Sequence, residues 1–344
     1  MTKLIEALSS ETGLRSLDIH RIMNRAPVMY KTFFIEKRSG DLRLISQPSR
    51  EVKFLQRALM NVLLADLPIH ECATAYRTGH SLLANAAPHA GDGPILKIDL
   101  TDFFPSIRSV DWVSYCKNKN LPLSDEEISL TSRLLFHRKP GTRTLSLAVG
   151  APSSPMLSNI LMHDFDALIL ENRENAYVRY TRYADDMTFS APRTGHLNGV
   201  FQTVAKTIRA TAHPSLSINI KKTTYATRKY GRSVTGLTLA NDGRVTIGHK
   251  NKRKIHAAIY NAKLGKSSRE ELQITAGMLA YVNSVEPEFL NVLRRRYGVD
   301  VIDDVKRMII KGRRLDKHAP PLARILDTEH PLTEDDFSNN DVEE

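Results

Sequence analysis

Three aspartates in this sequence have the surroundings expected of ligands for divalent metal ions. Asp99 ends a short apolar run, residues 94–99, and Asp185 and Asp186 stand together within residues 177–190, where aromatic and β-branched residues flank them. Carboxylate oxygens are the ligands that Mg²⁺ prefers. Two such ions about 4 Å apart activate a hydroxyl nucleophile and neutralise the charge that grows on a phosphorus under attack. The three aspartates therefore predict nucleotidyl transfer with two Mg²⁺ ions, for which Mn²⁺ is a possible substitute.

The elements around these aspartates follow from the spacing of apolar residues. Residues 94–99 have the pattern of a buried strand that ends in a carboxylate. Residues 177–190 predict a hairpin that carries the Asp pair at its turn. Helices are expected over residues 50–66, from about Ser109 onward, over residues 156–169 and through most of residues 243–315.

Composition narrows the class of protein. The chain has 344 residues, 41% of them hydrophobic, and a net charge of +11, which favours an anionic partner such as nucleic acid. Only residues 316–344 depart from this balance, with 9 acidic against 2 basic residues, and they predict a flexible acidic tail. No apolar run is long enough for a membrane helix and no leader is evident, so we expect a cytoplasmic protein without a membrane partner.

The two cysteines, Cys72 and Cys116, are far apart and lack the spacing of a zinc site. We expect both to be core residues that form no disulfide.

The three aspartates belong to a series of four motifs that follow one another along the chain. KIDLTDFFPSI at residues 97–107 is followed by GAPSSP at 150–155, YADD at 183–186 and INIKKT at 218–223. In order and spacing they resemble motifs A, B, C and D of reverse transcriptases. The resemblance implies an α+β, right-hand polymerase fold with fingers, an antiparallel-sheet palm and a helical thumb. The boundaries expected are fingers and N-terminal region over 1–93, palm over 94–240 with a fingers segment at about 115–148, a basic thumb over 241–315 and the acidic tail over 316–344.

The resemblance also assigns roles to single residues. It makes Asp99, Asp185 and Asp186 the catalytic metal ligands. Lys222 matches the motif D lysine near the leaving pyrophosphate, a charge stabiliser and possible general acid, and Lys221 is its rival. Phe104 matches the aromatic residue that excludes a ribose 2′-hydroxyl.

Three further positions concern the nucleotide. Arg43 resembles the fingers arginine that contacts the incoming triphosphate, with Lys37 a weaker candidate. Gly150 suits close approach of backbone to nucleotide and template. The family usually has Pro-Gln before this glycine, where this chain has Ala148 and Val149. This departure bears on fidelity, nucleotide affinity and activity.

Two more motifs narrow the family. NAAPH at residues 85–89 and Val-Thr-Gly at 234–236 resemble the NAxxH and VTG signatures of bacterial retron reverse transcriptases. The resemblance implies that the partner is a structured non-coding msr-msd RNA, and that dNTPs are polymerised from the 2′-hydroxyl of an internal guanosine. The product would be branched multicopy single-stranded DNA, msDNA, in an antiphage defence system with a separately encoded effector protein.

Basic and polar residues in these motifs and in the thumb are the candidates for RNA or primer binding. They are Asn85, His89, Val234, Thr235, Gly236, Lys250, Lys252, Arg253, Lys254, Arg294, Arg295 and Arg296. Two kinds of alternative remain open. One is another bacterial reverse transcriptase, of the group II intron or diversity-generating type, and the other is a noncatalytic RNA-binding scaffold that keeps the polymerase fold.

Overall fold

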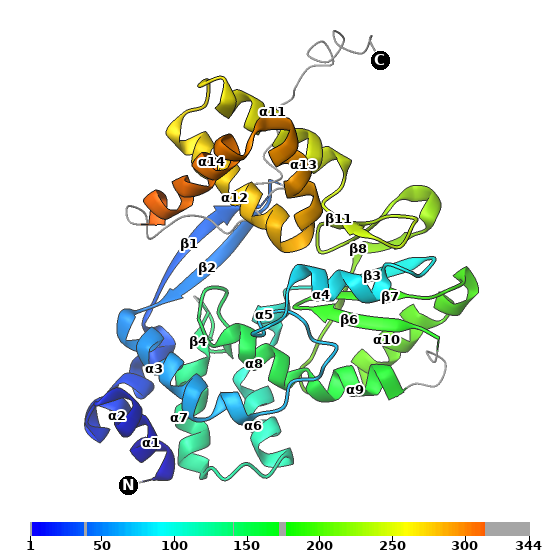
Figure 1. The fold of residues 1–344 in the computed structure, drawn as a ribbon. Coiled ribbons are helices and arrows are strands. Elements are labelled where there is room, and N and C mark those ends of the chain that lie inside the picture. Colours follow the sequence, from blue (N-terminus) through cyan, green and yellow to red (C-terminus); the bar gives the residue numbers. More distant parts are fainter. Residues whose placement is uncertain (1, 38–39, 140, 172–176, 314–344) are drawn as a thin grey trace, which may run out of the picture. The chain divides into compact units, whose positions relative to one another are not determined.

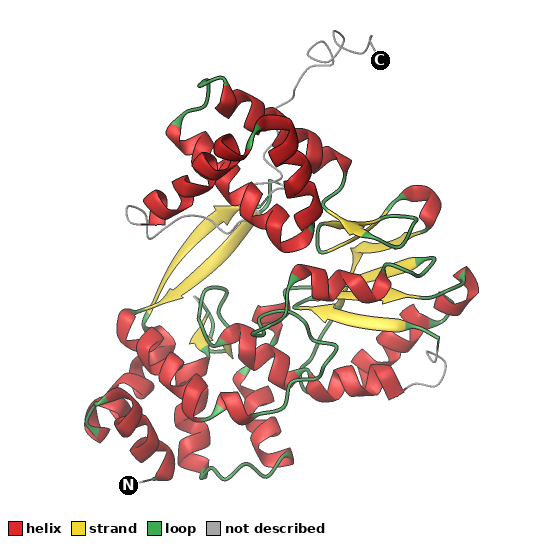
Figure 2. Cartoon of the chain, in the orientation of Figure 1, coloured by secondary structure: helices red, strands yellow, loops and turns green. Residues whose placement is uncertain are grey.

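The computed structural model describes residues 2–37, 40–139, 141–171 and 177–313 (Figures 1 and 2). The chain divides into two compact units. The first comprises Met1–Thr235 and Leu239–Arg244, and the second Gly236–Thr238 and Val245–Glu344. The predicted acidic tail, residues 316–344, lies outside the described residues.

A four-stranded antiparallel sheet with strand order β6-β7-β3-β8 lies at the centre of the first unit. Its strands are β3 (Ile95–Leu100), β6 (Arg179–Tyr183), β7 (Asp186–Ser190) and β8 (Ile218–Ala226). The predicted hairpin is confirmed as β6 and β7, and the predicted strand as β3, which ends one residue later than expected. Ile95, Ile98 and Leu100 are buried, and β3 is a central strand with a neighbour on both sides.

Helices α8 (Ser154–Leu161), α9 (His163–Glu171) and α10 (Val200–Ala210) complete this region. The expectation of one helix over 156–169 was wrong, because the chain breaks at Met162. Asp164 and Asp166 lie in the first turn of α9, where the positive end of the helix dipole favours carboxylates and hence a new helix start. Helices α9 and α10 contact each other beneath the sheet in the view of Figure 1.

The N-terminal part of the first unit combines helices with a hairpin. Its elements are α1 (Lys3–Thr12), α2 (Ser16–Arg25), η1 (Ala26–Val28), β1 (Tyr30–Glu36), β2 (Leu42–Pro48), α3 (Arg50–Val62) and η2 (Leu64–Asp66). The predicted helix over 50–66 is α3 followed by the 3-10 turn η2. Val52, Leu55 and Leu59 form its buried face, and the Ser49 hydroxyl caps its first turn.

The segment between β2 and the β6–β7 hairpin contributes further short elements. They are α4 (Leu82–Ala86), η3 (Ala87–His89), α5 (Phe103–Ser106), α6 (Ser109–Asn118), α7 (Asp125–Leu135), β4 (His137–Arg138) and β5 (Leu145–Ser146). Helix α6 begins at the predicted residue. Glu127 in α7 accepts a hydrogen bond from the Leu4 N–H at 3.1 Å, which ties α7 to α1. Cys72 and Cys116 are buried and free, as predicted.

Short elements follow the sheet along the chain. They are η5 (Thr194–Leu197), η6 (Arg228–Tyr230), β9 (Arg232–Val234), β10 (Leu237–Leu239) and β11 (Val245–Thr246). The chain passes from the first unit to the second within this stretch.

The second unit is helical, as residues 243–315 predict. Its helices are α11 (His249–Lys263), α12 (Arg269–Val285), α13 (Pro287–Tyr297) and α14 (Val299–Arg313). The core of this unit lies between apolar faces such as those of Ile255 and Ile259 in α11 and Leu290 and Leu293 in α13. None of the helices in the described ranges has the length and apolar content that crossing a bilayer requires.

Candidate active site

The first unit brings the three predicted aspartates together at one end of the sheet. Asp99 in β3 is the direct antiparallel partner of Asp186 in β7. Asp185 lies in the two-residue turn between β6 and β7, and its carbonyl accepts a hydrogen bond from the Leu100 N–H at 3.1 Å. Ala184, the other turn residue, has a positive φ of 57°. The turn is therefore fastened to the strand that carries Asp99.

The site concentrates negative charge. Burial raises the pKa of Asp185 and of Asp186 above the usual aspartate value, and the Asp99 carboxylate adds to both shifts. Two lysines oppose this charge. Lys97 Nζ lies 3.6 Å from Asp186 Oδ2, and Lys222 Nζ lies 3.1 Å from Asp99 Oδ1. The end of the sheet is thus an anionic site that cations balance.

An irregularity in β8 selects Lys222 over its neighbour. Asp99 is opposite Asn219 and Lys97 is opposite Thr224, so residues 220–223 of β8 face only Ile98 of β3. Such a bulge re-aims side chains. Both lysine side chains are exposed, and Lys222 Nζ reaches both oxygens of Asp99, at 3.1 and 3.2 Å. Of the two candidate lysines, Lys222 is the one that contacts the Asp99 carboxylate in this structure.

The donor set fits hard divalent cations. All three aspartates offer oxygen ligands, the type that Mg²⁺ and Mn²⁺ prefer, and their crowding favours a positive partner. Among the described residues, no three carboxylate, imidazole or thiol side chains are already gathered as a ligand group. Lysine ammonium groups lie beside Asp99 and Asp186 instead, at the positions where positive charge is needed.

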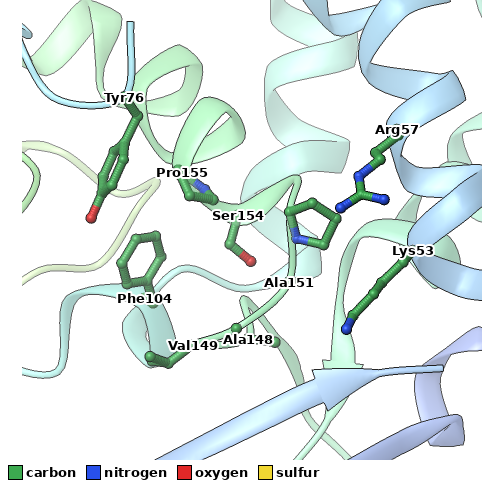
Figure 3. Close-up of a pocket in the computed structure, with 11 residues that line it drawn as sticks. Lys53, Arg57, Tyr76, Phe104, Ala148, Val149, Ala151, Ser154 and Pro155 are labelled. Atoms are coloured by element: carbon green, nitrogen blue, oxygen red, sulfur yellow. The ribbon is translucent and has the colours of Figure 1, made fainter. Parts of the chain in front are cut away.

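A cavity of about 340 Å³ lies in the first unit between α3, the GAPSSP loop and Phe104 (Figure 3). Phe104, Tyr76 and Val149 form one side of its lining, and Lys53 and Arg57 of α3 form the other. The cavity therefore combines an aromatic and aliphatic wall with two cationic side chains.

Gly150 joins the GAPSSP loop to β2. It has a φ of 126°, and a Cβ there would lie 3.0 Å from the Ser46 carbonyl oxygen and 3.2 Å from Ile45 Cγ2. The Ser46 N–H also donates to the Val149 carbonyl at 2.9 Å. Both the φ and the close approach require glycine. The close approach expected at Gly150 is thus made to β2, while Gly150 also lines the cavity.

Arg43 lies on the β1–β2 hairpin, opposite Ile35, with an exposed side chain. Since residues two apart share a face of a strand, Arg43 is on the same face as Ile45, which touches Gly150. Burial raises the pKa of Tyr76 to about 12, and the positive charge of Arg43 lowers it. The weaker candidate, Lys37, follows β1 and is also exposed.

Comparison with known proteins agrees with this geometry. A family model described as "Reverse transcriptase (RNA-dependent DNA polymerase)" matches residues 35–255. The retron Ec83 reverse transcriptase of Escherichia coli is 33% identical to this chain over 290 residues, which cover 83% of this chain and 92% of that protein. The chain belongs to the retron reverse transcriptases.

Two more relatives support this assignment. The retron Ec86 reverse transcriptase of Escherichia coli is 30% identical over 87% of this chain and 92% of that protein. The retron Mx65 reverse transcriptase of Myxococcus xanthus is 30% identical over 84% of this chain and 69% of that protein. Among solved structures, apo telomerase from Candida tropicalis aligns with a TM-score of 0.46 and 12% identity over 86% of this chain and 62% of that one. That likeness is too weak to bear on function.

Family membership confirms three predictions. The chain is an RNA-directed DNA polymerase, it is of the retron type, and its fold class is the α+β, right-hand polymerase fold. Reverse transcriptases generally use divalent metal ions, which agrees with the oxygen donors found at Asp99, Asp185 and Asp186.

Asn85 and His89 of this reverse transcriptase lie in its interior, with no side-chain exposure. Asn85 Oδ1 accepts a hydrogen bond from the Thr74 hydroxyl at 2.8 Å. The two ring nitrogens of His89 lie 2.6 Å from Ser190 Oγ in β7 and 2.8 Å from Thr181 Oγ1 in β6. Buried side chains cannot touch RNA, so these two side chains are not available for direct contact with RNA in this structure.

The protonation of His89 follows from its partners. Ser190 donates its one proton to Asp92 at 2.6 Å, so His89 Nδ1 must carry the proton that it donates to Ser190. Burial lowers the pKa of His89 to about 4, which keeps the ring neutral near pH 7. A neutral histidine therefore bridges the two strands of the hairpin that carries Asp185 and Asp186.

The VTG signature forms a turn. Val234 ends β9 and is fully buried, so it too is not available for direct contact with RNA. Thr235 and Gly236 are the two residues between β9 and β10 and have positive φ values of 48° and 81°. Positive φ at both positions is the pattern of a type I′ turn. Helix α4, which contains Asn85, contacts both β6 and β9, so the two retron signatures lie together.

The predicted basic candidates of the second unit divide into two groups. Lys250, Arg253, Arg295 and Arg296 are exposed, and Lys254 is half-buried. Lys252 and Arg294 are engaged within the unit, since Lys252 Nζ lies 2.5 Å from Glu286 Oε1 and Arg294 Nη2 lies 3.7 Å from Asp303 Oδ1. The exposed group is the better placed for phosphates.

Sequence reasoning missed the residues that hold the catalytic turn. Arg182 is fully buried and donates to both carboxylate oxygens of Asp166, with a shortest distance of 2.6 Å. It also donates to Asn159 Oδ1 at 3.0 Å and to the Ala184 carbonyl at 3.1 Å. The alternation of residues 177–183 placed Tyr180 and Arg182 on one strand face, which was the available signal. Lys53, Arg57 and Tyr76 at the cavity were also missed.

Proposed function

We propose that this retron reverse transcriptase copies a cognate structured non-coding RNA, its msr-msd transcript, into branched msDNA. Synthesis starts from the 2′-hydroxyl of an internal guanosine and consumes dNTPs. The observation that carries the proposal is the pairing of Asp99 with Asp186 beside Asp185, on a sheet whose strand β6 contacts α4, the helix that begins the NAAPH signature and also contacts β9. The similarity to retron enzymes of two bacterial genera supports it.

We propose that Asp99, Asp185 and Asp186 hold two Mg²⁺ ions. When bound, these ions lower the pKa of the attacking hydroxyl and neutralise charge on the reacting phosphate. Lys222, beside Asp99, stabilises charge at the leaving pyrophosphate and can give it a proton. Lys97 offsets charge at Asp186 in the absence of nucleotide.

The cavity beside this site receives the incoming nucleotide. Phe104 packs against the sugar at C2′ and excludes a ribose hydroxyl, and Arg43 binds the triphosphate. Gly150, which has no side chain, lets the backbone of the GAPSSP loop come close to the nucleotide and template. The aliphatic Val149 contributes contact area to this wall where an amide is usual. Specificity here rests on shape and charge rather than on a hydrogen bond from position 149.

RNA is gripped by the exposed basic residues of the second unit. Lys250, Arg253, Arg295 and Arg296 neutralise phosphates and release counterions, which makes the affinity for RNA fall with salt, and the half-buried Lys254 follows Arg253 on α11. Asn85, His89, Val234, Thr235 and Gly236 act indirectly, by shaping the surface around α4 and β9. The enzyme acts in the cytoplasm, in antiphage defence, with a separately encoded effector protein.

The test is expression of the gene with its flanking DNA in bacteria, followed by RNase digestion and electrophoresis. A discrete short DNA whose mobility changes with a 2′-5′ debranching enzyme is expected. Asp185→Asn should abolish this DNA and leave RNA binding nearly intact, while Asp66→Asn, an equal change of charge at an exposed site on η2, should change neither.

Other outcomes would redirect the proposal. A DNA whose mobility debranching leaves unchanged would contradict priming from an internal 2′-hydroxyl and favour a group II intron or diversity-generating type. Retained synthesis in Asp185→Asn would overturn the metal-ligand assignment. RNA binding without synthesis on a primed RNA template would favour the noncatalytic scaffold.

A further inference from the structure

Tyr76 has an unusual backbone conformation. Its φ is 61°, in the left-handed region that bulky residues rarely adopt. Such conformations cost of order 1–3 kcal/mol and cluster at functional sites, where the surrounding structure enforces them. The Tyr76 side chain is half exposed, so burial of a large ring does not explain the position.

The neighbouring backbone is held by contacts that would maintain this conformation. Ala73 forms a parallel bridge with Arg182, through the Thr74 N–H to the Arg182 carbonyl at 2.9 Å and the Arg182 N–H to the Cys72 carbonyl at 2.8 Å. Asn159 Nδ2 donates to the Ala75 carbonyl at 2.8 Å. The residue before Tyr76 is therefore fixed by Asn159, whose other amide atom binds the buried Arg182.

The ring that this backbone presents lies among aromatic residues at the cavity. Its centroid is 6.5 Å from that of Phe104 and 6.2 Å from that of Tyr183, both in tilted contact. Phe104 also contacts Phe103, with centroids 5.4 Å apart. Figure 3 shows Tyr76 and Phe104 facing each other on the same side of the cavity. Phe104 thus has an aromatic neighbour on either side, one from its own helix and one from Tyr76.

We infer that Tyr76 is a positioning residue for Phe104, which it holds in the orientation that excludes ribonucleotides. The inference rests on the proposed role of Phe104 at the sugar. Phe104 lies on α5, a single short turn, and Tyr76 supplies it with an aromatic contact from a distant segment. The ring does this, since the contact between Tyr76 and Phe104 is one between aromatic rings, with centroids 6.5 Å apart.

The experiment measures discrimination, defined as the kcat/KM for a dNTP divided by that for the matching rNTP on a primed RNA template. Tyr76→Asn removes the ring but keeps a residue type that tolerates the left-handed conformation. Tyr76→Phe is the matched control, because it keeps the ring. Phe104→Ala defines the loss when the gate itself is removed.

Tyr76→Asn should lower discrimination about 3- to 10-fold, the value of an aromatic pair, mainly by raising kcat/KM for the rNTP. Tyr76→Phe should leave it within twofold of the parent. In the double variant Tyr76→Asn/Phe104→Ala, discrimination should equal that of Phe104→Ala alone, because Tyr76 acts through Phe104. A merely structural role would lower kcat/KM for both nucleotides equally and leave the ratio unchanged.

The outcomes separate the two claims. If Phe104→Ala lowers discrimination and Tyr76→Asn does not, the role of Tyr76 is overturned and the gate stands. If Phe104→Ala leaves discrimination unchanged, the gate assignment fails and the inference fails with it. Additive losses in the double variant would show that Tyr76 acts independently of Phe104, which also overturns it. Tyr76→Leu serves in the same test if Tyr76→Asn does not fold.

Discussion

Replacement of Arg182 by methionine tests the buried network behind the catalytic turn. Arg182 and Asp166 are both fully buried, and the ion pair between them has a shortest distance of 2.6 Å. Methionine keeps much of the side-chain volume but leaves the Asp166 carboxylate with the Tyr180 hydroxyl, 2.8 Å away, as its remaining hydrogen-bond donor on the hairpin. The Ala184 carbonyl also loses its bond from Arg182.

The expected cost follows from the uncompensated charge. Breaking a buried pair by removal of one partner costs about 3–5 kcal/mol, whereas replacement of both partners by apolar residues is often neutral. Arg182→Met should therefore lower the Tm by about 10 °C, at about 2–4 °C per kcal/mol for a unit of this size. The double variant Arg182→Met/Asp166→Leu should regain most of that loss.

The assay is thermal unfolding of both variants beside the Asp66→Asn control. A single variant as stable as the control would refute the cost assigned to the buried charge, and so would a double variant less stable than the single one. DNA synthesis at a temperature where the double variant is folded tests whether Arg182 also holds the turn that carries Asp185. It should remain below that of the parent, because the turn that carries Asp185 has lost the donor to Ala184.

Two further predictions concern His89 and Gly150. The folded protein keeps His89 neutral with a pKa of about 4, whereas the unfolded chain protonates near 6.5, so the stability that His89 contributes is complete above pH 6.5 and is lost as the pH falls towards 4. When the pH is lowered from 7 to 5, the free energy of unfolding of the parent should fall by about 2 kcal/mol more than that of His89→Gln. The measurement is unfolding at a series of pH values, and equal falls for the two proteins would contradict the burial of a neutral ring. Gly150→Ala should raise the KM for the incoming dNTP about tenfold, because its Cβ would press on Ser46, and Gly13→Ala, where a Cβ meets open space, should leave KM unchanged.

The parts of the site that follow local patterns could be predicted from the sequence. Alternating aromatic and β-branched residues around YADD gave the hairpin, and the apolar run before Asp99 gave its partner strand. That these aspartates act together came from the resemblance to a family, and the register that places Asp99 opposite Asp186 came only from the structure. The break between α8 and α9 at Met162 was not predicted, because the apolar repeat continues across it and only the local hydrogen bonds differ.

The parts that depend on distant partners could not be predicted. Asn85 and His89 were predicted to bind RNA or primer, and the hydroxyls that satisfy His89 belong to Thr181 and Ser190, some hundred residues away in the sequence. Tyr76 was not singled out from the sequence, because the rings beside it come from two other segments. Lys221 and Lys222 could not be separated because the bulge in β8 suspends the two-residue period on which such a choice depends.

That bulge also bears on how this enzyme can change during evolution. The number of residues between Asn219 and Thr224 in β8, and not the strand register, brings Lys222 to Asp99. Within this bulge the Thr223 hydroxyl donates a hydrogen bond to the Asn219 carbonyl at 3.1 Å. Loss or gain of one residue there would move a different side chain to the carboxylates, even though every motif remained recognisable. Selection should therefore preserve the length of this stretch more strictly than the identity of its exposed residues, such as Ile220. Grafts between retron enzymes should take β8 as a unit.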